Sequence, residues 1–523
     1  MTQSAEKKLL IKASVLIMFA TFLSRVFGLI RIQVINYVYP QELLDAFWAA
    51  YKIPNTLREL LAEGALSAAF IPVFAALLAL KNDGKDASLL ASNVFNALFL
   101  ITAAVVAAGM LLVPLFMPYY VSGFADDAVR IAFSIELGQM MMPFLLLMSM
   151  GAVVMGVLNG REHFAAPAFA PVFFSLGMIA VIWFFGERGA EYLAWGVLAG
   201  GVCQLLFQLL FLRGGRGFRY TFTLSFKDEN LRKVLRLMLP AALALGVVQI
   251  NQLIVPLFAS FSQGGISALQ NAILVVQMPQ GVFAIAISTA ILPGLSRKAS
   301  LGDTEGFKRS MGDGLALVTF FMVPAALFLL FFRYSIIDAI FNLGGHFDSA
   351  AVHATAEALF WYSFGLIAMG GTVLANRFFY SIQNTRTPLV LASVSVAANI
   401  ILNFLFHMLS DNTALIAFAN SLSMTLNFVL LLIFAGRKTG GLYWGHIFRE
   451  SAKIAAAALA MVLAVYALEL LIPLAPDRTT LAAFLRLGLM LFAGLLVYGI
   501  FALAFRVTEV RFVLNAIRAR VRK

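Results

Sequence analysis

The chain has 523 residues, of which 61% are hydrophobic and only 12% are charged, and its formal net charge is +12. Soluble domains average about 45–50% apolar and about 25% charged residues, so lipid must cover much of this surface and a soluble enzyme is excluded. Membrane topology explains the positive charge better than nucleic acid does, because basic residues accumulate in the cytoplasmic loops of membrane proteins.

Apolar segments long enough to cross a bilayer core of roughly 30 Å recur along the whole chain. In chain order they cover residues 9–37, 43–79, 87–117, 126–158, 165–185, 190–212, 233–261, 264–296, 308–332, 350–380, 387–408, 412–436, 450–473 and 480–505. The predicted fold class is therefore an all-α polytopic membrane protein with about 14 transmembrane helices.

The basic residues give this map an orientation. If the N-terminus lies in the cytoplasm, most of the 38 Lys and Arg residues fall in cytoplasmic segments. The opposite side then holds Arg130, Arg188, Arg333, Arg478 and Arg486. An even number of helices with both termini in the cytoplasm follows from the positive-inside rule.

The sequence also repeats itself. The stretch ALSAAFIP at 65–72 returns as AISTAILP at 286–293, 221 positions later, and Pro167 and Pro388 have the same separation. Parallel repeats of this kind build transporters. We predict two six-helix lobes around a central cavity, at 1–213 (helices 1–6) and 214–440 (helices 7–12). Two further helices and a basic cytoplasmic tail then occupy 441–523.

Cations lie inside the first two apolar segments, at Arg25, Arg31, Lys52 and Arg58. A charge at the bilayer centre costs at least about 2.5–3.5 kcal/mol, so such residues usually face a bundle interior or a watery cavity. Each pair is six residues apart with a helix breaker between, Gly28 in the first and Pro54 in the second. We expect these breakers to turn both cations toward one cavity and to act as hinges of a gate.

The acidic residues of the first lobe, and its cations, each have more than one possible role. Glu59 and Glu63 share a helix face and either pair with the arginines or carry a proton. Asp45 either caps the second helix or bridges to a cation. Arg25 can instead snorkel to lipid phosphates, and the deeper cations can belong to purely structural ion pairs.

The second lobe has no charged residue between Leu237 and Ser296, where glutamine and asparagine stand instead. The cavity is therefore expected to be cationic on one wall and neutral on the other. Because the arginine fork makes two hydrogen bonds to phosphate, the inferred substrate is an anionic, phosphorylated amphiphile.

The sequence shows few motifs for nucleotide or metal binding. The sequence contains no P-loop, so no ATP-driven engine is expected within it. Asn399 and Asn403 share one helix face; they either hydrogen-bond between helices or form part of a cation site, and they are weak candidates for metal ligands.

The opening residues resemble a known family. SRVFGLIR at 24–31 and DAFWAAYKIPNTLRELLAEGALSAAFIPVF at 45–74 are similar to the N-terminal signature of the MurJ/MviN lipid II flippases. The similarity continues through FAAPAFAPVFFSLGMI at 164–179, VVQINQLIVPLFASF at 247–261 and ISALQNAILVVQMPQGVFAIAISTAILPGLSR at 266–297.

This resemblance implies a transporter of the bacterial cell inner membrane, within the multidrug/oligosaccharidyl-lipid/polysaccharide exporter superfamily. It implies that lipid II, the undecaprenyl-pyrophosphate-linked disaccharide peptide of peptidoglycan biosynthesis, moves from the cytoplasmic to the outer leaflet. Together with the charge pattern it assigns substrate binding to Ser24, Arg25, Arg31, Lys52, Asn55 and Arg58. Gating or ion pairing is assigned to Gly28, Asp45, Pro54, Glu59 and Glu63. The expected partners are lipid II, membrane lipids and cell-wall synthesis proteins, with no nucleic acid and no cofactor.

Several questions stay open at this point. Leu274 and Gln277 stand where family members commonly carry an arginine and an acid. Coupling to membrane potential, H⁺ or Na⁺ is undecided. The alternative functions are a flippase for another polyprenyl-pyrophosphate glycolipid, a drug/cation antiporter of the same superfamily, and a non-transporting scaffold for cell-wall enzymes.

Overall fold

The computed structural model describes residues 3–80, 84–212, 218–410, 412–472 and 480–510. Side chains are described from Leu16 onward, apart from positions 63, 68, 243–245, 247 and 248. Residues 511–523, which hold most of the predicted basic tail, lie outside the described residues. Two compact units divide the chain, unit 1 at Met1–Ile266 and unit 2 at Ser267–Lys523.

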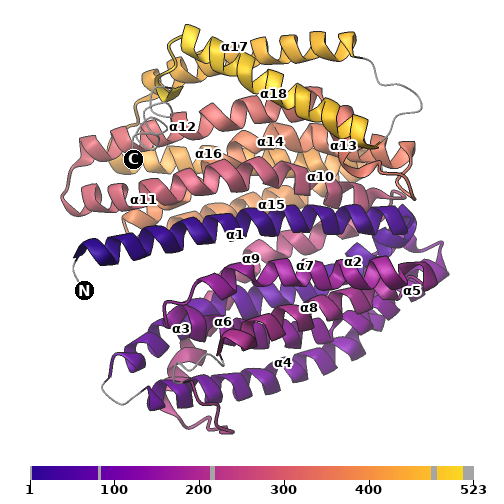
Figure 1. Cartoon of the computed structure of the whole chain (residues 1–523), viewed down its shortest axis with the longest axis vertical. Helices are drawn as coiled ribbons and strands as arrows, with labels where there is room; N and C mark the ends of the chain where they lie inside the picture. The colour runs from indigo at the N-terminus through magenta and orange to yellow at the C-terminus, as the bar shows by residue number, and fades with distance from the viewer. Residues whose placement is uncertain (1–2, 81–83, 213–217, 411, 473–479, 511–523) are drawn as a thin grey trace. The chain divides into compact units, whose positions relative to one another are not determined.

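Unit 1 is built from helices (Figure 1). In chain order they are α1 (Gln3–Val38), α2 (Gln41–Arg58), the π-helix η1 (Glu59–Gly64), α3 (Ala65–Leu78), α4 (Lys85–Tyr120), the 3-10 turn η2 (Ser122–Phe124), α5 (Ala128–Met141), α6 (Pro143–Gly160), α7 (Ala165–Phe185), the 3-10 turn η3 (Gly186–Arg188), α8 (Tyr192–Leu212) and α9 (Glu229–Ala259).

Unit 2 continues the helical pattern. Its elements are α10 (Gly265–Pro279), which begins just before the unit boundary, the π-helix η4 (Gln280–Ala284), α11 (Ile285–Ser300), α12 (Thr304–Phe331), α13 (Arg333–Phe341), α14 (Ser349–Ser381), α15 (Arg386–Leu409), α16 (Ala414–Thr439), α17 (Trp444–Leu471) and α18 (Thr480–Ala504). Within it α14 packs on α16, and α17 packs along α18 (Figure 1).

Thirteen segments of the described chain are long and apolar enough to cross a membrane. The predicted span 233–261 corresponds to α9, in which a shorter apolar stretch, Gln249–Ala259, is found, so the fourteenth crossing stays a prediction. Several predicted spans are composite: 43–79 corresponds to α2, η1 and α3, and 264–296 corresponds to α10, η4 and α11. The predicted all-α polytopic membrane fold is confirmed.

The internal repeat is visible in the helix boundaries. The two π-helices begin at Glu59 and Gln280, which are 221 positions apart, the separation of the repeated sequence stretches. Residues 128–160, which form α5 and α6, correspond to α14 at Ser349–Ser381, because both the first and the last residues of these two segments are 221 positions apart. π-Helical turns are rare and often lie at functional sites. The lobe boundary expected after residue 213 stays a prediction, since α9 groups with unit 1 by its packing on α2 and α3.

Close packing of α7 and α8 positions the ring that the site uses. A Cβ added to Gly200 would lie 2.6 Å from the Phe174 carbonyl oxygen, so only glycine permits this approach. Gly177 makes the reciprocal approach to the backbone of α8. Because α1 packs along α7, the fixed ring of Phe174 faces the end of α1 that carries Arg31.

The connection from α8 to α9 is bound to α4 by side-chain amides. Asn93 Nδ2 donates to the Ser225 carbonyl oxygen at 3.1 Å, and Ser225 N–H donates to Asn93 Oδ1 at 2.8 Å. One turn later Asn96 Nδ2 donates to the Thr223 carbonyl oxygen at 2.7 Å. These bonds satisfy an extended backbone that has no helical partner, and they fix where α9 begins.

Candidate functional site

Arg31 lies in the last third of α1 and is only partly exposed. Its guanidinium carbon lies 5.1 Å from the centre of the Phe174 ring, within reach of a cation–π interaction. Its buried Nε makes no hydrogen bond to the described part of the chain. Arg31 also interacts electrostatically with Tyr51 and Arg58 of α2. The structure therefore brings a cation of the first helix next to a cation of the second.

Arg58 ends α2 in a small polar cluster. Its Nε donates to Asn55 Oδ1 at 3.0 Å, and Asn55 Nδ2 donates to Glu59 Oε1 at 2.9 Å. The direct distance from the Arg58 guanidinium to Glu59 is 3.5 Å, which is long for a charge-assisted hydrogen bond. Asn55 thus links the two charges, and the ion pair itself is loose.

Lys52 connects this cluster to α9. Its Nζ donates to Gln252 Oε1 at 2.7 Å, and it is also attracted by the Glu59 carboxylate. Pro54 is buried between Lys52 and Arg58, and the π-helical turn begins five residues after it. The four residues Lys52, Asn55, Arg58 and Glu59 therefore lie where the helix geometry changes.

Asp45 belongs to a different contact. The helix α2 begins at Gln41 with Pro40 as its N-cap, so Asp45 does not cap it. The Asp45 carboxylate is fully buried and accepts a hydrogen bond from Arg130 of α5 at 2.9 Å. Arg130 in turn lies over the Phe124 ring at 4.0 Å. Of the two alternatives for Asp45, the structure has the bridge to a cation.

The remaining predicted residues are placed as follows. Ser24, Arg25 and Gly28 lie on α1, which runs unbroken through all three. Arg25 is partly buried and lies six residues, or about 9 Å along the axis, before Arg31. No described atom lies within 4 Å of a Cβ added to Gly28. The Glu63 side chain lies outside the described residues.

The weak cation-site candidates lie in unit 2. Asn399 and Asn403 are both 1% exposed on α15, and Asn403 Nδ2 donates to Asn399 Oδ1 at 2.9 Å. The described residues contain no group of three His, Cys, Asp or Glu side chains placed to hold a metal ion. In α10, Leu274 is partly buried and Gln277 is exposed.

The cationic cluster, defined as Arg31, Lys52, Asn55, Arg58 and Glu59, has three positive charges and one negative charge. Its cations are held by an aromatic ring and by neutral amides as well as by the Glu59 carboxylate. Such a surface can exchange its weak neutral contacts for a polyanion. Charge spacing alone did not identify Phe174, Gln252 or Arg130 as the partners, because each comes from a distant part of the chain.

A family model described as "Lipid II flippase MurJ" matches residues 36–477 of the chain. A probable lipid II flippase MurJ of Rhizobium tropici is 32% identical over 445 residues, which is 83% of this chain and 82% of that protein. The relative from Vibrio cholerae, also named a probable lipid II flippase MurJ, is 33% identical and covers 85% of each chain.

Solved structures give the same picture at the level of the fold. A lipid II flippase MurJ in an inward closed conformation matches with a TM-score of 0.78 and 26% identity, covering 94% of this chain and 99% of that one. An inward-facing multidrug resistance MATE family transporter of the MOP superfamily has a TM-score of 0.66 at 14% identity, and covers 80% of this chain and 94% of its own. The second likeness shows a shared fold only.

Breaking the Asp45–Arg130 pair should be strongly destabilising. Asp45→Asn takes the carboxylate away from the largely buried Arg130 guanidinium, and because a fully buried pair costs about 3–5 kcal/mol to break, we expect a loss toward the lower end of that range. Thermal unfolding of the purified protein measures the effect, and exposed Asp126→Asn is the matched control. Adding Arg130→Met to Asp45→Asn should recover part of the loss. Equal melting temperatures for Asp45→Asn and Asp126→Asn would contradict a stabilising pair.

Proposed function

The chain belongs to the lipid II flippase MurJ family, and from this membership we propose that it moves lipid II from the cytoplasmic to the outer leaflet of the bacterial inner membrane by alternating access. It thereby supplies peptidoglycan biosynthesis and maintains cell shape. The protein is a transporter, and the proposal assigns it no chemical step. The observation that carries the proposal is the cationic cluster on α1 and α2.

The cluster suits the pyrophosphate of lipid II. Arg31 and Arg58 each offer a planar fork that can donate two hydrogen bonds to phosphate oxygens. Lys52 adds a point charge that now rests on the neutral Gln252 amide. Replacing that amide and the loose Glu59 contact by phosphate oxygens strengthens every cation's interaction. Ser24, Arg25 and Asn55 complete the proposed headgroup site.

We assign the hinge motion of transport to the helix-disturbing residues that lie beside the cations. The π-helical turn at Glu59–Gly64 follows Pro54, and the one at Gln280–Ala284 follows Pro279. A π-turn carries one residue more than an α-turn, so shifting it along the helix rotates the residues beyond it. We assign the hinge of the first lobe to Gly28 and to the Pro54 segment. Glu59 then exchanges partners as the gate moves, and a gating or ion-pairing role for Glu63 stays a prediction.

The rival functions fit less well. A drug/cation antiporter shares the fold, but a surface with three cations and one carboxylate repels cationic drugs. A flippase for another polyprenyl-pyrophosphate glycolipid would use the same cluster, because the pyrophosphate is common to both lipids. A scaffold for cell-wall enzymes would not need the cations at all.

Removing a positive charge from the cationic cluster, or from Arg25 of the proposed headgroup site, should strongly lower flipping. In cells depleted of their own lipid II flippase, an enzyme that cleaves lipid II only from outside reports how much reaches the outer leaflet. We expect the chain to restore cleavage, and we expect Arg31→Ala or Arg25→Ala to lower it at least tenfold. Arg58→Ala should act similarly, since it removes the second fork.

The matched control is Arg188→Ala, which removes an exposed arginine outside the cluster. It should leave cleavage unchanged at equal membrane levels. Full cleavage by both Arg25→Ala and Arg31→Ala would contradict the proposed site. If the unsubstituted chain restores no cleavage although it is inserted, its substrate is another lipid-linked molecule, and Leu274 and Gln277 become the first positions to change.

The hinge at Gly28 can be tested without steric damage. Because a Cβ at Gly28 meets no described atom within 4 Å, Gly28→Ala should stabilise α1 by up to about 1 kcal/mol. If α1 bends at this position during transport, the same variant should slow flipping severalfold while the melting temperature stays equal or rises. Normal flipping would assign the hinge to the Pro54 segment alone.

The driving force we propose is the membrane potential. Moving one charge through 100 mV is worth roughly 2.3 kcal/mol, and a potential that is negative inside drives an anionic headgroup outward. Dissipating the potential with valinomycin and K⁺ should therefore lower flipping severalfold, whereas replacing Na⁺ by K⁺ at constant potential should not. Loss of flipping in the absence of Na⁺ would instead favour a cation site at Asn399 and Asn403.

A further inference from the structure

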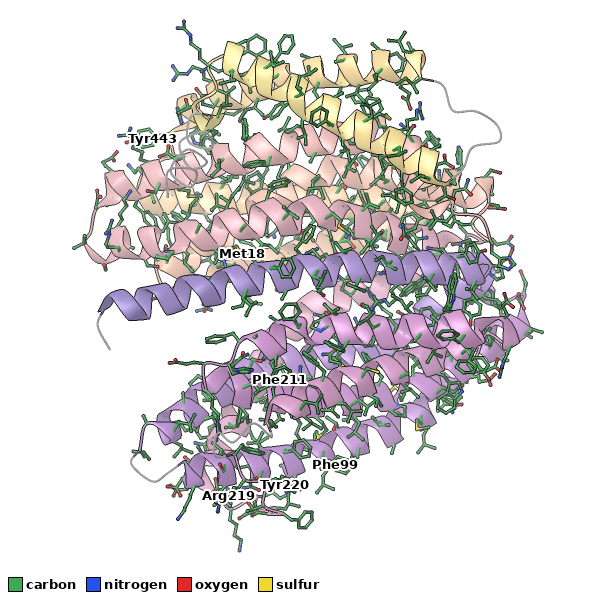
Figure 2. All side chains as sticks on the ribbon, in the orientation of Figure 1. Met18, Phe99, Phe211, Arg219, Tyr220 and Tyr443 are labelled. Carbon is green, nitrogen blue, oxygen red and sulfur yellow. The ribbon has the colours of Figure 1, made fainter. Side chains whose placement is uncertain are left out.

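A second polar site lies within unit 2. A cavity of about 650 Å³ lies between the middle of α11, the first half of α12, the start of α17 and the residues that follow α18. Tyr443, which Figure 2 labels, is one of its lining residues. Apolar side chains form much of its wall, including Ala290, Ile291 and Leu317. Its polar lining comes from Arg309, Ser310, Asp313, Tyr443, His446, Thr508 and Glu509.

Glu509 is the unusual member of this lining. The residue is only 6% exposed, and its buried Oε2 accepts no hydrogen bond from the described residues. It lies just after α18, where the Val507 amide bonds back to the Ala502 carbonyl oxygen and turns the chain toward α17. A buried carboxylate is stable only if it holds a proton or meets a cation.

The neighbouring acidic residues Glu450 and Asp313 do not need a bound proton or an added cation. Glu450 of α17 is fully buried, but it accepts hydrogen bonds from Lys453 Nζ at 2.8 Å and from the Thr508 amide at 3.1 Å. Asp313 of α12 lies 3.9 Å from His446 Nε2 and is largely exposed. Burial raises the pKa of Glu509, and the nearby Glu450 and Asp313 carboxylates raise it further, while a hydrogen bond from its own backbone amide and the charge of His446 oppose them. None of the ion pairs among the described residues includes Glu509, so its Oε2 can accept from a bound cation.

The cavity fits an organic cation better than a metal ion. The described residues contain no triad of His, Cys, Asp or Glu that would coordinate a metal. The cavity is also many times larger than a bare ion, and methylene groups can pack on Ile291 and Leu317. An alkylammonium has three N–H donors, which suit carboxylate oxygens.

We propose that this cavity binds a primary alkylammonium group, with Glu509 as the main acceptor and Asp313 as the second. Two sources can supply that group: the headgroup of an aminophospholipid, or a soluble amine. The lining adds Arg309, which can pair with a lipid phosphate. The same end of unit 2 carries Arg297, Lys298, Lys308 and Arg437, the charge expected at the level of lipid headgroups.

The experiment uses the full chain, purified and delipidated. Native mass spectrometry compares binding of phosphatidylethanolamine with that of phosphatidylcholine, whose quaternary ammonium has no N–H donor. Titration calorimetry with ethanolamine and putrescine tests the soluble source. We expect at least a tenfold preference for the primary amine in one of the two arms, and we expect Glu509→Gln to remove it.

The two arms separate the sources. Preference for phosphatidylethanolamine without measurable binding of free amines identifies a lipid site, and binding of free amines without lipid preference identifies a soluble ligand. Equal binding of all probes to the parent protein and to Glu509→Gln overturns the proposal and leaves Glu509 as a protonated carboxyl group. Exposed Glu229→Gln on α9 is the matched control and should keep the preference.

A second variant, Asp313→Asn, and the pH dependence of binding test the proposal even if Glu509→Gln does not fold. Asp313 is exposed, so Asp313→Asn should fold normally and weaken amine binding severalfold even if Glu509→Gln does not fold. Binding should tighten from pH 5.5 to pH 8, because protons compete with the ammonium for the Glu509 carboxylate at low pH, where the raised pKa of Glu509 favours its protonated form. Unchanged binding in Asp313→Asn together with weaker binding at higher pH would overturn the proposal.

Discussion

The cost of holding cations away from water is the constraint on which the site depends. Arg31, Lys52 and Arg58 lie in membrane-spanning helices, where an uncompensated charge costs several kcal/mol. The fold meets this cost with partial measures, namely the Phe174 ring, the Gln252 amide and the Asn55 amide. The Glu59 carboxylate lies 3.5 Å from Arg58. Contacts to a ring and to neutral amides can be exchanged for contacts to an anion without leaving a carboxylate unpaired.

The Asp45–Arg130 pair shows the opposite solution within the same unit. Its carboxylate is fully buried, its distance is 2.9 Å, and the arginine is also covered by Phe124. Exchanging this contact for a ligand would leave a buried charge unpaired, so the pair is suited to holding α2 against α5 and not to binding substrate. The two kinds of contact divide α2 into an anchored first half and an adaptable second half. Transport needs both, because a headgroup site can move as a unit only if the helix that carries it is fixed elsewhere.

Much of the fold could be predicted from the sequence, since long apolar segments and a repeat of 221 positions are properties of composition and spacing. The segment 126–158 corresponds to Ala128–Gly160, and 350–380 corresponds to Ser349–Ser381. The partners of the charges could not be predicted in this way. Arg130 lies 85 positions from Asp45 and Gln252 lies 200 positions from Lys52, and no periodicity links residues at such distances. The π-turns were also missed, because Pro54 predicts a disturbance of the helix without fixing its form.

The repeat separates what the two halves share from what distinguishes them. Both contain a proline followed by a π-helical turn, and the two turns begin 221 positions apart. Beside the first turn stand Lys52, Arg58 and Glu59, whereas beside the second stand Gln277 and Gln280. The backbone device is therefore common to both halves, while the charge belongs to one. Since a duplicated device can serve a motion that both halves perform, and the second half lacks the cations proposed to recognise the headgroup, substitutions at the second π-turn should alter the rate of transport more than the choice of substrate.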